Sequence, residues 1–271
     1  MKNMKLFLLA IAVAAVSAFD MEQMLAYVDP EAENAQIPLY NPPIPDDDIE
    51  DDIYYKPKAC CTPDQWEGYG AGHGAAKKGS HHGRKRILFS EFYHFHYDFK
   101  GKRLAYTEFV ATSHHRKMNF TMIANFKSKK GYVIYAGNKC KTFSLKQSMH
   151  KYCVPQNASY LSSPILGAAS DSLKVNAFGG SFHSKRMAGA YMLTFTSKLC
   201  IPVSGAVGVK SKRGSAANGF SFFNITPGIK SARVFTPPSS CSKYVDVSED
   251  EVFDSQSDLG QIVHEKLMHG F

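Results

Sequence analysis

The chain has 271 residues, of which 44% are hydrophobic and 13% aromatic, and its formal net charge is +8 at pH 7. It is long enough to bury one large core. After the N-terminal region no segment is apolar enough to cross a bilayer, which argues against an integral membrane protein.

The first 18 residues are typical of a secretory signal peptide. Lys2 and Lys5 precede an apolar run from Leu6 to Val16, and Val16-Ser17-Ala18 forms a cleavage site of small residues. A membrane anchor is the alternative, but this run falls well short of the roughly 20 residues that a spanning helix needs. We therefore expect an exported protein whose partners do not include nucleic acid.

Charge is divided by region. Residues 20–52 hold 11 acidic residues and no Lys or Arg, whereas residues 56–243 hold 29 Lys and Arg against six Asp and Glu. We interpret residues 19–57, which are acidic and rich in Pro, as a disordered extension. Its Asp46–Asp52 run offers carboxylates for loose calcium binding but lacks the EF-hand spacing. The basic region would attract anionic lipids or glycans. The alternative is that these charges only make a solvated surface and bind no partner.

Residues 68–86, rich in Gly, His and Lys, are interpreted as a flexible loop. After them apolar and polar residues alternate, so that Phe89, Tyr93, Phe95 and Tyr97 share one face. A predominantly antiparallel β domain over residues 58–243 follows, then an acidic tail over 244–271 with a short helix from Ser248. The expected strands are 87–99, 103–112, 118–127, 131–136, 140–146, 171–183, 188–198, 202–210, 218–226 and 231–235.

Four motifs in a fixed order resemble the ependymin-related proteins over residues 57–243. They are Cys60-x-x-Pro63-x-x-Trp66-Glu67-Gly68, Pro155-Gln156-Asn157-x-Ser159, Cys200-x-Pro202-Val203 and Phe235-Thr236-Pro237-Pro238-x-x-Cys241. The resemblance implies curved antiparallel sheets enclosing a hydrophobic pocket, similar to bacterial lipoprotein carriers, and a homodimer. It also implies calcium association, a role in cell-matrix adhesion, and residence outside the cell or in the lysosomal lumen.

Aromatic side chains dominate the apolar strand faces and can line a pocket or fill a core. For any single residue the core is the stronger interpretation, and the pocket follows from the resemblance. The expected lining residues are Phe95, Tyr97, Phe120, Met122, Tyr191 and Phe195.

Six cysteines in an exported chain predict disulfides. Zinc is the competing hypothesis, but Cys60-Cys61 lacks the spacing of a zinc knuckle. The sequence allows 15 pairings. The resemblance implies Cys60–Cys200 and Cys140–Cys241, which leaves Cys61 and Cys153 for each other.

No cofactor is implied, and no G-x-S-x-G, P-loop or H-E-x-x-H motif occurs, so an enzyme is the least favoured class. His94, His96 and Asp98 share a strand face that suits a metal or a solvated surface equally. Three sequons, at Asn119, Asn157 and Asn224, predict a glycoprotein. The leading hypothesis is a secreted, disulfide-bonded glycoprotein that binds a hydrophobic ligand, with lipid favoured. The alternative is a matrix component that binds calcium and polyanionic glycans without an enclosed ligand.

Overall fold

A computed structural model describes residues 57–78, 86–113, 117–135, 137, 139–146, 148–168, 170–183, 187–211, 214–243 and 246–247. The expected signal peptide, almost all of the acidic extension and most of the acidic tail lie outside these residues. So do the Asp46–Asp52 run and the helix expected from Ser248. Among the described residues, no helix has the length and hydropathy to span a membrane.

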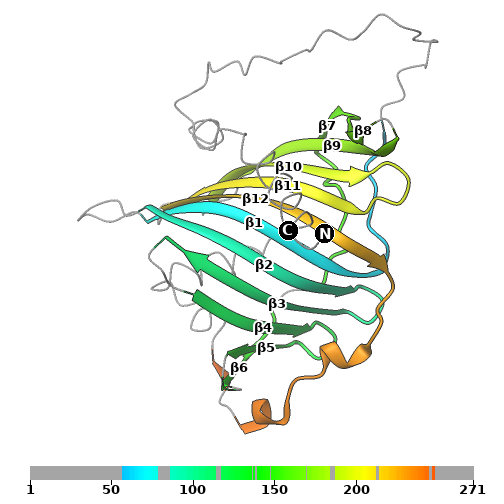
Figure 1. The fold of residues 1–271 in the computed structure, drawn as a ribbon. Helices are drawn as coiled ribbons and strands as arrows, with labels where there is room; N and C mark the ends of the chain where they lie inside the picture. Colours follow the sequence, from blue (N-terminus) through cyan, green and yellow to red (C-terminus); the bar gives the residue numbers. More distant parts are fainter. Residues whose placement is uncertain are drawn as a thin grey trace, which may run out of the picture.

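The described chain forms one 13-stranded sheet in the order β13-β6-β5-β4-β3-β2-β1-β12-β11-β10-β9-β7, with β8 paired to β9 (Figure 1). Every pairing is antiparallel except that of β13 with β6. The strands are β1 (Gln65–Lys78), β2 (Arg86–Asp98), β3 (Arg103–Thr112), β4 (Lys117–Asn125), β5 (Lys130–Tyr135), β6 (Lys139–Ser144), β7 (Ser159–Ser162), β8 (Ile165–Ala168), β9 (Asp171–His183), β10 (Met187–Thr196), β11 (Pro202–Ser211), β12 (Gly214–Pro227) and β13 (Asp246–Val247).

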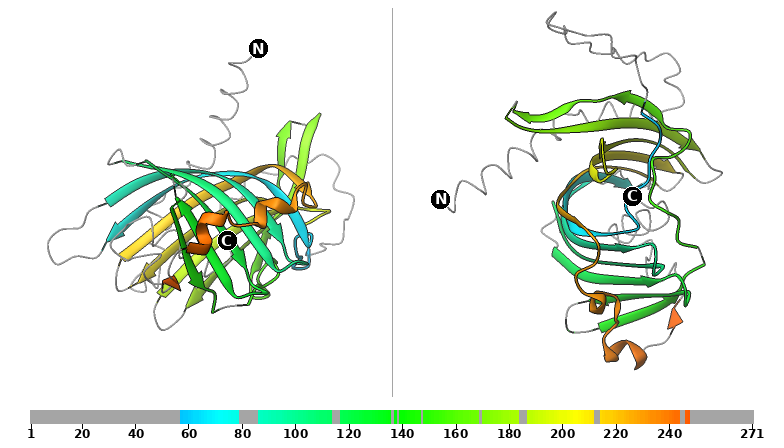
Figure 2. Two further views of the ribbon diagram at one scale, coloured as in Figure 1. Left: turned by 90° about the horizontal axis from the view of Figure 1, so that it is seen from below. Right: turned by 90° about the vertical axis from the view of Figure 1, so that its right-hand side faces the viewer.

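The expected antiparallel β fold is confirmed. The nine strands predicted between residues 87 and 226 all occur, with boundaries that shift by at most four residues. Alternation of apolar and polar residues located them because one face of each strand is packed and the other is wetter. The sheet curls along its length, so it has a concave inner face and a convex outer face (Figure 2).

The flexible loop expected over residues 68–86 is wrong for its first half. Residues 65–78 form β1, which pairs with β2 on one side and β12 on the other and so joins the two halves of the sheet. The alternation of apolar and polar residues is not visible in this strand, because glycines occupy the inner positions 70, 72 and 74. A Cβ on Gly70 would lie 2.2 Å from the Tyr93 ring, and one on Gly74 would lie 2.2 Å from the Phe89 ring. These glycines are therefore needed because rings of β2 lie across β1.

The same arrangement recurs around the inner face. Large side chains on one strand lean over a glycine on its neighbour, so the glycine provides the space and the ring covers the exposed backbone. Glycines at such positions favour curvature of the sheet toward its inner face. Besides the two pairs on β1, the structure contains Phe143 over Gly131, Tyr191 over Gly180, Phe182 over Gly189 and Phe220 over Gly205.

A crossing segment (residues 145–158) lies on the inner face. It links β6 and β7, which stand at opposite ends of the strand order, so it must pass the whole sheet. Its Leu145 and Val154 are buried in the same apolar cluster as the inner-face rings, and Tyr152 packs against that cluster. Among the described residues outside the sheet, the crossing segment is thus the part of the chain that packs on the inner face.

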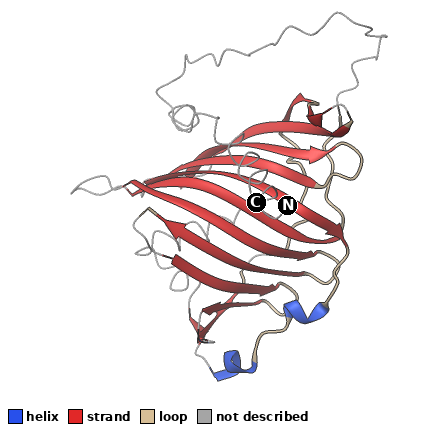
Figure 3. Cartoon of the chain, viewed as in Figure 1, coloured by secondary structure: helices blue, strands red, loops and turns tan. Residues whose placement is uncertain are grey.

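The strand expected at 231–235 is wrong. Residues Ala232–Phe235 form a 3-10 helix, η2, whose N-terminus is capped by the Ser231 hydroxyl, and Ser239–Lys243 form a second, η3 (Figure 3). Phe235 is buried on the outer face against Ala105 of β3 and Ile123 of β4. The apolar residues of this segment therefore serve to cover the outer face rather than to extend the sheet.

Candidate ligand-binding face

The six residues expected to line a pocket lie together on the inner face. Five of them, at positions 95, 97, 120, 122 and 195, are at most 4% exposed and belong to one apolar cluster. Tyr191 packs against that cluster. Register explains the grouping, because Tyr106 of β3 stands opposite both Phe95 of β2 and Met122 of β4. The structure thus brings the expected residues together on one face.

Rings at one end of this face contact one another directly. The Trp66 ring centroid lies 4.9 Å from that of Phe95 and 5.7 Å from that of Tyr97. The Tyr152 ring of the crossing segment lies 6.0 Å from the Phe195 ring. Such offset and tilted contacts stabilise packed aromatic groups beyond the burial of their area. This end of the inner face is therefore a filled core.

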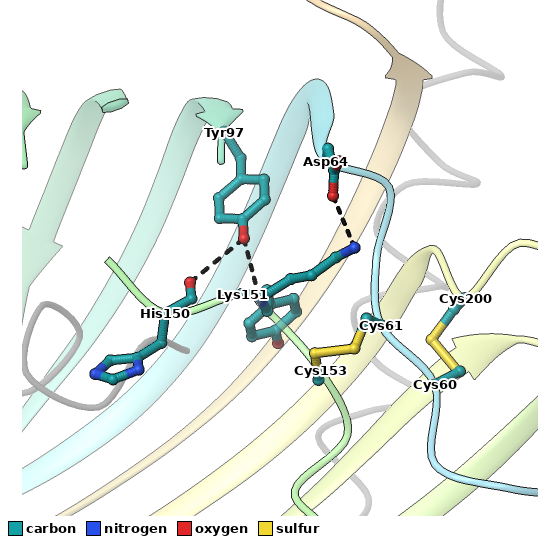
Figure 4. Close-up of a disulfide and its surroundings, with 9 residues drawn as sticks. Cys60, Cys61, Asp64, Tyr97, His150, Lys151, Cys153 and Cys200 are labelled. Carbon is teal, nitrogen blue, oxygen red and sulfur yellow. Dashed lines mark hydrogen bonds and ion pairs between the residues drawn. A yellow bond between two sulfur atoms is a disulfide. The ribbon is translucent and has the colours of Figure 1, made fainter. Parts of the chain in front are cut away.

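Tyr97 fastens the crossing segment to the sheet (Figure 4). Its hydroxyl accepts a hydrogen bond from the Tyr152 backbone N–H at 2.9 Å and donates to the His150 carbonyl at 3.4 Å. Burial raises the pKa of Tyr97 to about 12, so the phenol stays protonated at physiological pH. Lys151 adds an ion pair to Asp64 at 2.7 Å, just before β1.

Three disulfides join Cys60 to Cys200, Cys61 to Cys153 and Cys140 to Cys241. These are the expected pairs, and no described cysteine is free. The adjacent Cys60 and Cys61 reach in different directions, the first to the turn between β10 and β11 and the second to the crossing segment (Figure 4). The crossing segment is thus joined to the residues before β1 by a disulfide, an ion pair and backbone hydrogen bonds.

Two carboxylates and an amide interrupt the apolar inner face at some distance from this filled end. Glu91 is 4% exposed, Glu108 is 1% exposed and Asn218 is 9% exposed. Asn218 Nδ2 donates to Glu91 Oε1 at 3.0 Å, across Gly72 of β1. A Cβ on Gly72 would lie 2.8 Å from Glu91 Oε1, so this bridge also depends on a glycine.

Sequence analysis missed these carboxylates, although a signal was present. Glu91 occupies an inner position of β2 between Phe89 and Tyr93, and Glu108 an inner position of β3 between Tyr106 and Val110. Burial of a charged residue within an otherwise apolar strand face costs free energy unless the charge is paired or hydrogen-bonded. The breaks in the alternation therefore mark the two positions.

Two tyrosines neighbour the carboxylates on the same face, because Tyr93 stands opposite Glu108 and Tyr106 precedes Glu108 by two residues. Burial raises the pKa values of Tyr93 and Tyr106 well above the usual value, and the negative charges of Glu91 and Glu108 raise both further. The Oη atom of Tyr106 and the Oδ1 atom of Asn218 are buried without a hydrogen-bond partner in the described part of the chain. Unpartnered buried polar atoms in a native protein commonly mark a bound water, ion or ligand.

The outer face accounts for the histidine pattern. His96 Nδ1 lies 3.3 Å from Glu67 Oε2, and Lys230 binds the same carboxylate through its backbone N–H at 3.1 Å and its Nζ at 3.3 Å. Burial opposes ionisation of Glu67, but the hydrogen bonds from Lys230 and His96 outweigh it and lower its pKa. Burial and the neighbouring His94 lower the pKa of His96. This network holds the segment before η2 on the sheet.

Asp98 belongs to a separate structural network. It accepts hydrogen bonds from the Gln65 side chain and the Gly101 N–H, each at 2.8 Å, and forms an ion pair with Arg103. Although burial acts to raise the pKa of Asp98, the hydrogen bonds from Arg103, Gly101 and Gln65 lower it. The residues that the structure describes contain no group of three or more metal-binding side chains. The three outer-face residues are thus engaged in structural contacts.

The three sequons differ in their surroundings. Asn119 is exposed on the outer face of β4, Asn157 is exposed in a turn of the crossing segment, and Asn224 is exposed with a positive φ of 52°. Glycosylation of these residues stays a prediction.

Comparisons with solved structures return weakly similar β proteins. A LolA superfamily protein from Nitrosomonas europaea shares 10% identity, covers 64% of this chain and 90% of its own, and has a TM-score of 0.24. A DUF1329 family protein from Desulfovibrio piger shares 8% identity over 64% of this chain and 90% of its own, with a TM-score of 0.27. The ywiB protein from Bacillus subtilis shares 6% identity over 58% and 94%, with a TM-score of 0.24.

Comparison at the sequence level is more specific. No curated protein matches the chain. The family model described as Ependymin matches residues 114–241, which contain three of the four motifs given above. The Cys60–Gly68 motif precedes that segment. The resemblance of this chain to the ependymin family is therefore confirmed over residues 114–241.

Proposed function

We propose that this protein is a secreted, disulfide-bonded glycoprotein that binds a hydrophobic or amphipathic ligand, with lipid favoured, on the concave face of its sheet. The role proposed is binding rather than catalysis. One observation carries the proposal: a broad apolar face receives only the crossing segment as a covering layer within the described residues. An apolar sheet face requires a partner layer, and an apolar ligand supplies one.

Two measurements test this function. Lipid extraction and mass analysis of natively purified protein should recover about one acyl ligand per chain. A fluorescent fatty acid should also bind the extracted protein with saturable stoichiometry. If the unsubstituted protein carries no ligand and binds no probe, that result contradicts the proposal.

A matched pair of variants adds the location. Phe120→Asp places a charge on the inner face, where the residue is 3% exposed, and should reduce probe binding strongly. Phe109→Asp is the control, because Phe109 is 42% exposed on the outer face of the adjacent strand. Equal loss of binding in both variants would place the ligand elsewhere. Circular dichroism should establish that each variant is folded.

Binding of polyanions is a second candidate, favoured by the distribution of the acids. Four of the six carboxylates between residues 56 and 243 are at most 5% exposed, namely Glu67, Glu91, Asp98 and Glu108. The 29 Lys and Arg residues of the same region therefore meet few carboxylates at the surface. Such a surface would attract anionic lipids or sulfated glycans, most strongly at low salt. Heparin affinity measured against salt concentration tests it. Calcium binding, adhesion, a homodimer and lysosomal residence remain proposals from the family resemblance.

A further inference from the structure

Four aromatic residues gather on the convex outer face of the central strands. The ring centroid of Tyr69 on β1 lies 5.9 Å from that of Phe92 on β2 and 6.1 Å from that of Phe223 on β12. The Phe92 and Phe223 centroids are 6.0 Å apart. On the other side of β2, Phe109 of β3 stands directly opposite Phe92. Phe92 is 44% exposed and Phe109 is 42% exposed. These four residues form the outer aromatic patch.

The segment that covers the outer face lies away from the exposed end of this patch. Its Phe235 packs on Ala105 and Ile123, and Ala105 precedes Phe109 by four residues on β3, which corresponds to about 13 Å. The largest exposed apolar patch of a soluble protein is often functional. Four partly exposed rings offer on the order of a few hundred Å², whereas a stable interface buries roughly 800 Å² on each partner. The patch therefore suits a small covering group better than a second protein.

A sequon borders the outer aromatic patch. Asn119 of β4 stands directly opposite Phe109 in the register of β3 with β4. Residues opposed in this way point to one face, with Cβ atoms about 4.5 to 5.5 Å apart. Asn119 is exposed, and the hydroxyl of Thr121, which completes the sequon, lies 2.9 Å from that of Thr107 on the same face. A sugar attached to Asn119 Nδ2 would thus begin beside the exposed ring of Phe109.

We propose that an N-linked glycan on Asn119 covers the outer aromatic patch, with its first N-acetylglucosamine packed on the ring of Phe109. The inference rests on the glycosylation included in the proposed function and adds the place and the role of one glycan. One face of a pyranose ring carries C–H groups, and these pack on the negative face of an aromatic ring. The sugar hydroxyls point to water, so the glycan replaces an apolar surface with a hydrated one.

Asn157 provides a matched control. It also belongs to a sequon and is exposed, but it lies in the crossing segment, which packs on the inner face. The sheet therefore separates Asn157 from the outer aromatic patch. A glycan on Asn157 should add mass and solubility without contacting Phe109.

A double-mutant cycle tests the contact in protein made in eukaryotic cells and trimmed enzymatically to one N-acetylglucosamine per site. Peptide mapping should find this sugar on Asn119. Asn119→Gln, which removes the sugar, should lower the melting temperature by roughly 2 to 4 °C. The same change should have little effect once Phe109→Ser has removed the ring.

Two control variants separate this contact from a general effect of sugar or of surface polarity. Leu88→Ser changes another exposed apolar residue of β2, four positions before Phe92, and should leave the full effect of Asn119→Gln in place. Asn157→Gln should leave the melting temperature unchanged with or without Phe109. A measurement on the unsubstituted trimmed protein needs no variant: its proton NMR spectrum should show sugar resonances shifted upfield by an aromatic ring.

Several outcomes would overturn the inference. They are an unmodified Asn119, an equal effect of Asn119→Gln with and without Phe109, and an equal effect of Asn157→Gln. A natively purified dimer that Phe92→Ser separates into monomers would assign the patch to a second copy of the chain instead. If Phe109→Ser is unfolded, the NMR shifts decide. Ligand binding is judged separately, because the fatty-acid probe should bind Asn119→Gln as tightly as the unsubstituted protein.

Discussion

Replacement of Gly70 by Ala tests whether rings of β2 lie across the central strand. The new Cβ would lie 2.2 Å, 2.3 Å and 2.5 Å from three atoms of the Tyr93 side chain. Carbon atoms normally pack at about 3.5 to 4.0 Å, so the overlap is about 1 Å or more. Tyr93 is 2% exposed and its ring meets the edge of the Phe222 ring at 5.9 Å, which prevents a simple rotation away.

The magnitude follows from two opposing effects. Overpacking of a core costs about 1 to 3 kcal/mol. Replacing Gly by Ala also restricts the unfolded chain and returns about 0.4 to 1 kcal/mol. The net loss of unfolding free energy should be about 1 to 2 kcal/mol. In a chain of this size that lowers the melting temperature by roughly 2 to 8 °C.

Urea or thermal unfolding with the disulfides intact measures this loss. Gly179→Ala is the matched control on β9, because its Cβ would first meet, at 3.0 Å, the end of the half-exposed Leu161 side chain. That variant should be close to neutral. A Gly70→Ala protein as stable as the unsubstituted one would refute the arrangement of Tyr93 across β1.

Three further predictions concern acid, glycans and the extension. Burial and the neighbouring His94 lower the pKa of His96 in the folded protein. The stabilising contribution of neutral His96 is therefore present above the unfolded pKa of about 6.5 and is lost as pH falls through the folded pKa. Urea unfolding midpoints should decline from pH 7.5 to pH 5, and they should decline less in His96→Asn. Deglycosylation of protein made in eukaryotic cells should lower its mass through Asn157 and Asn119, and an unchanged mass would contradict this. Deletion of residues 20–52 should preserve folding and strengthen heparin binding at low salt, whereas unchanged affinity would show that the extension does not compete.

The limits of the sequence predictions have physical causes. Strands such as 103–112 were predictable because burial of one face imposes alternation. Strand β1 was not predictable, because the side chains that cover its inner face belong to β2. The glycines of β1 do not show in the sequence which rings of β2 lie over them. The segment 231–235 has the β-branched and aromatic residues of a strand, but the Ser231 cap and its position over the outer face make it helical.

The residues of the candidate site were likewise predicted only in part. The family resemblance led to the disulfides and to apolar residues such as Phe95 and Phe120, which lie on one face. Glu91 and Glu108 were overlooked because a charge in a strand is ordinarily assigned to the solvent side. The breaks in the alternation were the available signal, and the register of β2 with β3 confirms the inner position of both residues. Asn218 is 127 residues from Glu91 in the sequence, so no local pattern could connect them.

The bond between Cys140 and Cys241 has a consequence for solubility. An open sheet presents unpaired N–H and C=O groups along its last strand, and such strands add foreign strands and aggregate. Here β6 is that strand, and β13 pairs with it beside Thr142 and Phe143. Because the disulfide fixes η3 next to β6, it keeps the short β13 within reach. We therefore expect reduction of this bond to release β13 from β6 and to leave the backbone groups along that edge of β6 unpaired.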